Sequence, residues 1–241
     1  MLSSILGKNA GWLHTGLFAV FTVVNVYFLF TLDITTLILW LTLSNPIIGF
    51  LISGYQHRYC SHRSWQPPRW LEVICAYSSA ALLMTPSMAW AATHREHHRY
   101  TDKEGDPHGH VHSVLDNFLV FNRMPSIRMV PKWMIRDKLY VTQARWYWEI
   151  FIITMIIAYA LNLHMFLISA IAMSYFFQVT LNLLGHTRNF KLVNSHVLSV
   201  LYSGELYHKY HHEKPMDPRF GVIDAPYYLF IKWFNNETKR S

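Results

Sequence analysis

Charged residues are scarce in this sequence of 241 residues. Only 15% are Asp, Glu, Lys or Arg, compared with about 25% in ordinary globular domains, while 52% are hydrophobic and 16% are aromatic. Four stretches contain no charged residue at all: 9–32, 34–57, 73–94 and 150–187. This composition argues against a soluble domain and indicates an integral membrane protein.

Cysteine is equally rare, with only Cys60 and Cys75. Structural zinc sites favour thiolate ligands, so this scarcity argues against such a site. Because we expect both residues on or near the reducing side of the membrane, we interpret them as packed thiols and not as a disulfide.

The positions of positive charge predict how the charge-free stretches cross the membrane. A transmembrane helix needs about 20 apolar residues, and we expect four helices in two hairpins, over residues 11–31, 36–55, 149–162 and 164–185. All 21 Lys and Arg then lie on one side, and the two turns on the other side have none. Since positive charge stays in the cytoplasm, the sequence predicts an all-α, multi-pass membrane protein of one domain, 1–241.

Residues 73–93 are long enough to cross the membrane, but they are rich in small residues and contain Pro86. If they crossed, three arginines would be left on the outer side, and His57 would be separated from His94. We therefore expect this segment to be re-entrant or buried among the other helices.

Histidine is abundant by contrast. The pattern His-x-x-His-His occurs twice, and on a helix its three imidazoles project from one face. Two further histidines stand in HRYCSH, just beyond the second expected span. The eight residues all lie on the expected cytoplasmic side: His57, His62, His94, His97, His98, His208, His211 and His212.

This set of histidines indicates a metal centre in a helical cap on the cytoplasmic side. Neutral imidazole binds zinc, copper, iron and nickel, and eight ligands fit two octahedral ions better than one ion. Iron with nitrogen ligands and open positions can reduce O2 to an oxidant that attacks an unactivated C–H bond. An alkyl chain is the nearest target in a membrane.

Other histidines are left out of the metal set. We expect His14 and His164, in or beside the spans, to be hydrogen-bonded or interfacial residues. His108, His110 and His112 in DPHGHVH could form a further site, but we expect them to belong to a solvated loop.

The motifs HRYCSH, HREHH and HKYHH, in this order, resemble the histidine boxes of membrane fatty-acid desaturases. The closest likeness is to the Δ9-type group, which includes stearoyl-CoA desaturase and cyanobacterial acyl-lipid enzymes. The likeness runs from about Gly54 to Asp224 and includes DPH after the second box and Gly-Glu before the third. It implies an O2-dependent enzyme that introduces a cis double bond, Δ9 in this group, into a saturated acyl chain.

The resemblance also implies site residues. A family motif Asn-x-x-x-His at the end of the fourth span matches Asn182 and His186, so His186 joins the eight histidines as a ligand of two irons, with Asn182 acting through water. Trp90 matches a Trp that shapes the bent acyl tunnel. Ligating imidazoles need their other N–H oriented, and the candidate carboxylates are Asp102, Asp106, Glu205 and Asp224.

The expected partners follow from the same comparison. The acyl-CoA enzymes carry Arg-Asp immediately before the second box, where this sequence has Ala92-Thr93, so both acyl-lipid and acyl-CoA substrates stay open. No stretch resembles a cytochrome b5-like or ferredoxin-like carrier, so we expect a separate electron carrier, attracted by the +7 formal charge. Membrane lipids are further expected partners, and nucleic acid is not.

Two rival functions remain at this point. A membrane di-iron hydroxylase of an alkyl, sterol or carotenoid substrate shares similar boxes and is the alternative. A metal transporter would place its ligands near the middle of the bilayer, whereas these clusters lie at the cytoplasmic ends of the expected helices.

Overall fold

The structure, a computed structural model, describes residues 8–31, 34, 46–118, 125–186 and 191–236. This part of the chain is helical and contains no β-strand, only the isolated bridges His186 to Leu192 and Asn194 to Tyr207. The prediction of an all-α fold is confirmed. The elements are α2 (Lys8–Thr31), η1 (Phe50–Ser61), α4 (Arg69–Ala81), α5 (Ser87–Tyr100), α6 (Val114–Phe118), η3 (Ile127–Met129), α7 (Lys132–Arg136), α8 (Lys138–Arg145), α9 (Tyr147–Ala160), α10 (His164–Leu184), α11 (His196–Leu201), α12 (His208–Glu213), η4 (Tyr227–Ile231) and α13 (Lys232–Phe234).

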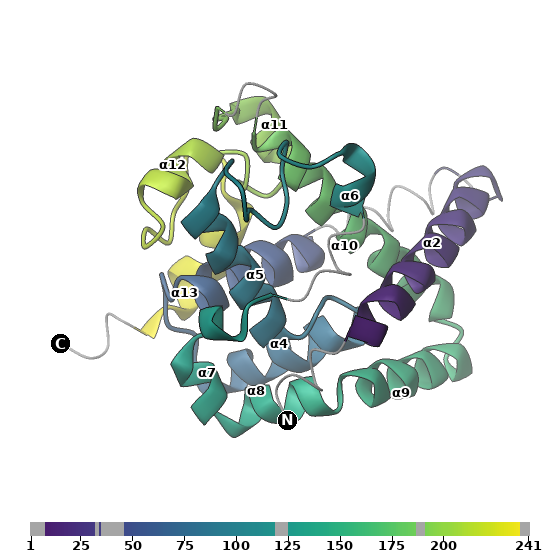
Figure 1. Ribbon diagram of the computed structural model, residues 1–241. Coiled ribbons are helices and arrows are strands. Elements are labelled where there is room, and N and C mark those ends of the chain that lie inside the picture. Colours follow the sequence, from purple (N-terminus) through teal and green to yellow (C-terminus); the bar gives the residue numbers. More distant parts are fainter. Residues whose placement is uncertain (1–7, 32–33, 35–45, 119–124, 187–190, 237–241) are drawn as a thin grey trace.

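The apolar helices α2, α9 and α10 form one side of the molecule (Figure 1). The chain turns after α9 at Asn162, whose φ of +56° lies in the left-handed region that Asn tolerates. α10 then returns and packs against both α9 and α2. Their shared core combines aliphatic and aromatic side chains, with the rings of Phe18 and Tyr175 stacked at 4.0 Å.

The outer face of α9 is apolar as well. Ile152, Ile153, Ile156 and Ile157 are each more than half exposed. An exposed aliphatic face of this kind is suited to contact with lipid.

Within the described residues, one helix, α10, is both long and apolar enough to cross a bilayer. α9 and residues 15–24 of α2 are shorter apolar helical segments. The expected spans 11–31, 149–162 and 164–185 fall on α2, α9 and α10, while residues 36–45 of the remaining span lie outside the described residues. The arrangement of four spans in two hairpins stays a prediction.

The described end of the expected span 36–55 changes its winding at Phe50. From Phe50 to Ser61 the chain forms a π-helix in which every residue is buried, and the helix extends beyond the expected boundary. Residues five apart point about 140° apart on an α-helix, whereas the i→i+5 hydrogen bonds of a π-helix bring them toward one side. This winding directs His57 and His62 toward the same part of the cap.

The charge-free block 73–94 is divided between α4 and α5. The turn between them contains Leu83, with φ +54°, and Pro86, which directly precedes α5. Both helices pack against η1.

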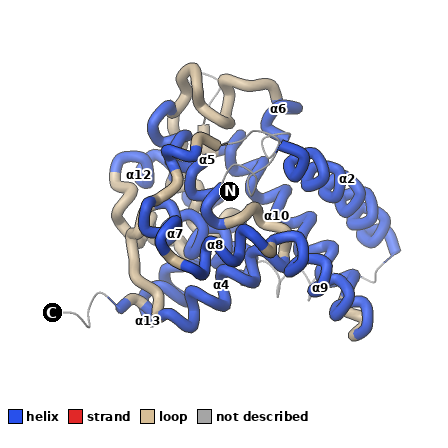
Figure 2. Tube along the Cα trace, turned by 60° about the horizontal axis from the view of Figure 1, so that its bottom comes forward, coloured by secondary structure: helices blue, strands red, loops and turns tan. Residues whose placement is uncertain are grey.

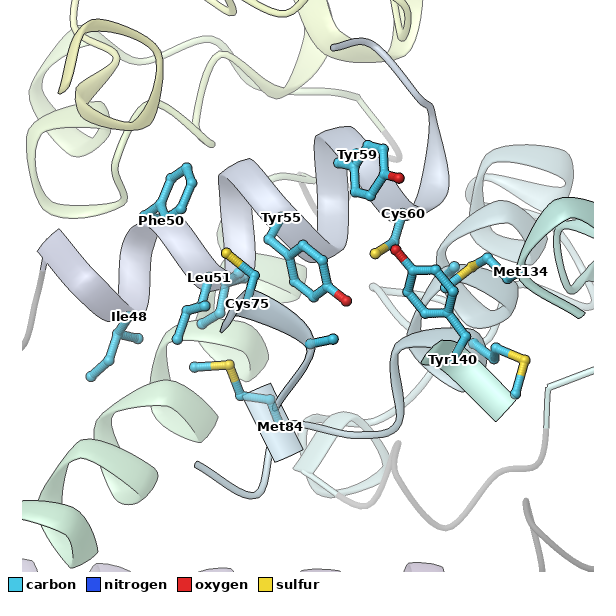
Figure 3. Close-up of a cluster of buried hydrophobic side chains, with 14 of the residues drawn as sticks. Ile48, Phe50, Leu51, Tyr55, Tyr59, Cys60, Cys75, Met84, Met134 and Tyr140 are labelled. Carbon is cyan, nitrogen blue, oxygen red and sulfur yellow. The ribbon is translucent and has the colours of Figure 1, made fainter. Parts of the chain in front are cut away.

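The core between η1, α4 and α8 holds both thiols. Figure 3 shows Cys60 between the phenol rings of Tyr55 and Tyr140, with Cys75 nearby. Both cysteines are free and buried, so the prediction of packed thiols is confirmed.

Helices α5 and α12 lie side by side away from the turn that joins α9 to α10 (Figures 1 and 2). They carry the two His-x-x-His-His boxes. The fold thus brings together segments separated by more than a hundred residues.

Candidate metal centre

Imidazole nitrogens converge in two groups inside the cap, and within each group the ligand atoms lie within 4.8 Å of one another. The first group contains five histidines: His57, His62, His94, His98 and His211. The second contains four: His97, His186, His208 and His212. All nine histidines singled out from the sequence and the family resemblance lie in these groups.

Each His-x-x-His-His box contributes to both groups. The i, i+4 pair of α5 and the middle histidine of α12, His211, belong to the first group. The i, i+4 pair of α12 and the middle histidine of α5, His97, belong to the second. Neighbouring residues on an α-helix point about 100° apart, so His97 and His98 face different groups although they are adjacent in the sequence.

The Nε2 atoms of each group face one another at short distance. In the first group the His57–His211 and His98–His211 distances are 2.8 Å, and His62–His94 is 2.9 Å. In the second group the distances are 3.0 Å for His186–His208, 3.1 Å for His208–His212 and 3.3 Å for His97–His212.

These distances fit metal coordination. Two nitrogens that each lie about 2.1 Å from one ion, at a right angle, are about 3 Å apart. Facing nitrogen lone pairs repel unless a proton or a cation lies between them. Each group therefore has the donor set and the spacing to hold one transition-metal ion.

Three carboxylates contact the outer nitrogen, Nδ1, of a histidine. A carboxylate at Nδ1 accepts its proton and leaves the lone pair on Nε2, the nitrogen that faces the group. The contacts are His57 to Glu205 at 2.5 Å, His97 to Asp106 at 2.8 Å and His186 to Asp102 at 2.9 Å. Three of the four candidate carboxylates thus lie where they can orient a ligand.

The fourth candidate, Asp224, contacts no histidine in the described structure. It accepts a hydrogen bond of 2.8 Å from Nη1 of Arg58. Arg58 is fully buried, lies 3.7 Å above the ring of Phe220 and is 3.8 Å from Glu205. Asp224 is therefore linked to Glu205 only through Arg58, a residue that the sequence analysis did not single out.

The charge on Glu205 is kept by its neighbours. Burial by itself raises the pKa of this carboxyl, but His57 and Arg58 bring the pKa below its usual range. Glu205 is therefore ionised at neutral pH.

Burial disfavours the charged form of several histidines in the two groups. Burial, together with the nearby imidazoles, lowers the pKa of His98 to about 3 and that of His212 to about 2. It also lowers the pKa of His97, His208 and His211 well below its ordinary value. Neutral imidazole is the form that binds metals.

Trp90 lies beside the first group, and Asn182 precedes a histidine of the second group in the sequence. The Trp90 ring stacks on His94 at 5.1 Å, and its Nε1–H donates to Oε1 of Gln178 in α10 at 2.8 Å. Asn182 is half-buried on the last turn of α10, four residues before His186.

Gly185 is a site residue that the sequence analysis missed. A Cβ at this position would lie 2.8 Å from the His208 ring. The missing side chain therefore lets His208 approach His186. In the sequence, a glycine directly before a candidate ligand could have indicated that another side chain approaches closely at this position.

The expectation of a solvated loop around His108 is wrong. Asp106 and His108 are buried, and the His108 ring lies 4.1 Å from that of His97. His110 Nε2 lies 3.0 Å from the carbonyl oxygens of Leu183 and His186, at the end of α10. The loop folds over the cap, where Asp106 contacts Nδ1 of His97.

His97, Asp106 and His108 also form a third group of donor atoms. Asp106 contacts His97 at Nδ1, whereas His212 contacts it at Nε2, so the third group lies on the outer side of a histidine of the second group.

Comparison with known proteins decides the family. The sequence matches the family described as "Fatty acid desaturase" over residues 34–228. The chain belongs to the fatty acid desaturase family. It is accordingly an oxidoreductase of lipid metabolism, and its relatives include delta-9 desaturases, as the resemblance of the three boxes indicated.

The similar proteins include three from Arabidopsis thaliana. Delta-9 acyl-lipid desaturase 2 is 30% identical over 241 aligned residues, which cover 90% of this chain and 78% of that protein. Palmitoyl-monogalactosyldiacylglycerol delta-7 desaturase, chloroplastic, is 39% identical over 72 residues, or 30% of this chain and 18% of that protein. Delta-9 desaturase-like 3 protein is 44% identical over 55 residues, or 23% of this chain and 18% of that protein.

Proposed function

We propose that this family member is a fatty acyl desaturase that uses two irons, O2 and electrons from a separate carrier to introduce a cis double bond into a saturated acyl chain. The observation that carries the proposal is the pair of histidine groups, whose Nε2 atoms face one another at 2.8–3.3 Å. A donor set of neutral imidazoles without thiolate suits iron that handles O2.

O2 would be the oxidant, and the irons would supply the redox chemistry that activates it. O2 receives two electrons and two protons from the donor side and two hydrogens from adjacent methylenes, and is released as two waters. The first group would hold one iron through five histidines. The second would hold the other through four, with Asn182 acting through water. Glu205, Asp106 and Asp102 keep the imidazoles in the tautomer that presents Nε2.

The proposed membrane placement follows the charge pattern. Four spans in two hairpins put the cap, with its histidines, on the cytoplasmic side, where a soluble electron carrier can reach it. The exposed isoleucines of α9 support a lipid-facing position for that helix.

We propose an acyl-lipid substrate. The relative that aligns with most of the chain is named an acyl-lipid desaturase, and Ala92-Thr93 replaces the Arg-Asp pair of acyl-CoA enzymes. Neighbouring methylenes are chemically alike, so only positioning selects the bond that is oxidised. Trp90, stacked on His94, would help to position the acyl chain, and Δ9 is the proposed bond position.

Expression in a desaturase-deficient host tests the proposal. Mass spectrometry with localisation of double bonds is expected to find a new Δ9 double bond in membrane lipids. Purified protein is expected to contain about two irons per chain. Hydroxylated products, or active protein with far less iron, would contradict the proposal.

His94→Ala is the test variant, because His94 belongs to the first group. It is expected to abolish the new double bond. His164→Ala is the matched control, since His164 lies at the first residue of α10, at the helix end remote from His186, and belongs to neither group. This control is expected to keep the double bond.

A further inference from the structure

A basic pocket lies next to the first histidine group. Its volume is about 850 Å³, and it opens between the beginnings of α4, α7 and α8. Arg95, which follows His94 directly in α5, lines it. The other lining residues are Arg69, Pro131, Lys132, Trp133, Arg136, Asp137 and Lys138.

Most of the positive charge in this pocket is unpaired. The lining contains five basic residues and one acidic residue, Asp137. Asp137 is already bound by Arg69, through two contacts of 2.6 and 2.8 Å. The other four cations, Arg95, Lys132, Arg136 and Lys138, are exposed and form no ion pair with a carboxylate of the described residues.

Trp133 gives the pocket a firm wall. Its ring lies 5.4 Å from that of Tyr59 and 5.2 Å from that of Tyr140. Both phenols donate hydrogen bonds of 2.6 Å to the buried carboxylate of Glu72. The wall is therefore held in place before any ligand arrives, which lowers the entropic cost of binding.

Along the chain and in space, the pocket lies close to the start of α9, the helix with the exposed aliphatic face. α8 leads into α9 with only Trp146 between them (Figure 1), and its eight residues span about 12 Å. Trp70 and Trp146 are 54% and 47% exposed, and tryptophans of this kind are typical of the membrane interface. On the proposed membrane placement, this is the region of the lipid headgroups.

We propose that this pocket binds the phosphate group of an anionic membrane lipid and so holds that lipid beside the metal centre. Arginine binds phosphate through two parallel charge-assisted hydrogen bonds, and lysines add charge. The pocket is shallow and open, and five of its eight lining residues are basic, which suits a phosphate headgroup at the membrane surface. The proposal rests on the membrane placement above and not on the identity of the metal or of the reaction.

Titration calorimetry tests the proposal with the full-length, iron-loaded protein in a neutral detergent. The probes are short-chain phosphatidylglycerol, short-chain phosphatidylcholine and glycerol phosphate. Phosphatidylglycerol is expected to bind at least about tenfold more tightly than phosphatidylcholine, and higher salt should weaken its binding. Binding is measured directly, so a failure here is distinct from a failure to find desaturase activity.

Arg136→Glu is the test variant, and Arg136→Gln is a milder second variant. We expect Arg136→Glu to lower the affinity for phosphatidylglycerol about tenfold or more, and Arg136→Gln to lower it less. Arg128→Glu is the matched control, because Arg128 is exposed in η3 and does not line the pocket. The control is expected to stay within about twofold of the unmodified protein.

The outcomes separate the sources of the phosphate. Weaker binding of glycerol phosphate supports a membrane lipid as the ligand. Equally tight binding of glycerol phosphate, lost in Arg136→Glu, supports the phosphate site but assigns it to a soluble ligand. The proposal is overturned if Arg136→Glu and Arg128→Glu have the same effect, or if Arg136→Glu weakens binding of an acidic electron carrier and leaves lipid binding unchanged.

Discussion

Nδ1 of His57 lies 2.5 Å from a carboxylate oxygen of Glu205, which follows it by 148 residues in the sequence. Ser53, one turn before His57, donates its hydroxyl to the other oxygen of the same carboxylate. Arg58 lies 3.8 Å from that second oxygen. A single buried carboxylate thus fixes the orientation of the first histidine box.

Glu205→Gln is expected to lower iron affinity roughly 10- to 100-fold, the usual cost of losing such a partner of a ligating histidine. It should also destabilise the protein by about 1–3 kcal/mol, because Arg58 loses a buried partner. Metal analysis and thermal unfolding measure both effects. Glu104→Gln changes an exposed carboxylate in the same way and should leave both quantities unaltered.

His97→Ala and His98→Ala are expected to remove different irons. Each variant should retain about one iron per chain, since the two residues belong to different groups. Mössbauer spectra of iron-57 protein should then show two distinct residual species. Identical residual spectra would contradict the division into two groups.

Gly185→Ala is expected to push the His208 ring away, because the added Cβ would lie 2.8 Å from it. Overpacking of this kind costs about 1–3 kcal/mol, and iron affinity should fall with the displaced ligand. Gly16→Ala is the control, since nothing lies within 4 Å of its new Cβ and a helical alanine is favoured over glycine. Unchanged iron binding in Gly185→Ala would show that His208 tolerates the shift.

Glu72→Gln is expected to destabilise the fold by about 1–3 kcal/mol while leaving the iron content unchanged. Glu72 accepts hydrogen bonds from Tyr59 and Tyr140 and is not among the metal-facing groups. Thermal unfolding of Glu72→Gln, Tyr140→Phe and the double variant measures their coupling. A double variant whose loss equals the sum of the single losses would argue against a shared network.

Removal of iron with a chelator is expected to lower the unfolding temperature, because the facing Nε2 lone pairs then lack a cation between them. Binding stabilises a folded protein by about 2.7 kcal/mol when free metal is roughly 100 times its Kd. Scanning calorimetry before and after chelation measures the change. Recovery of the original transition on adding ferrous iron would separate metal loss from irreversible unfolding.

The local part of the site could be predicted from the sequence. The i, i+3, i+4 spacing of the boxes is a property of a single helix, and α5 contains its whole box as expected. The role suggested for His186 came from the resemblance to a family, since nothing in its own spacing distinguishes it. Arg58 escaped notice because an arginine in an exposed loop and a buried arginine look alike in sequence.

The division of roles within each box could not be predicted. It depends on how α5 and α12 face each other and on the π-helical winding of η1, which sets the directions of His57 and His62. The buried loop of Asp106 and His108 was missed for a related reason. Its polar composition is typical of a solvated segment, and only the contact with His97 explains its burial.

By itself the sequence determined that this protein is apolar and helical, that its charged residues are excluded from four long stretches, and that its histidines stand at metal-binding spacings. These are properties of composition and of local geometry. Only the tertiary structure decided which nitrogens share a group, which carboxylate orients which imidazole, and where an unpaired basic pocket opens. Each of these depends on side chains far apart in the chain, whose meeting is set by the packing of helices and not by any local pattern.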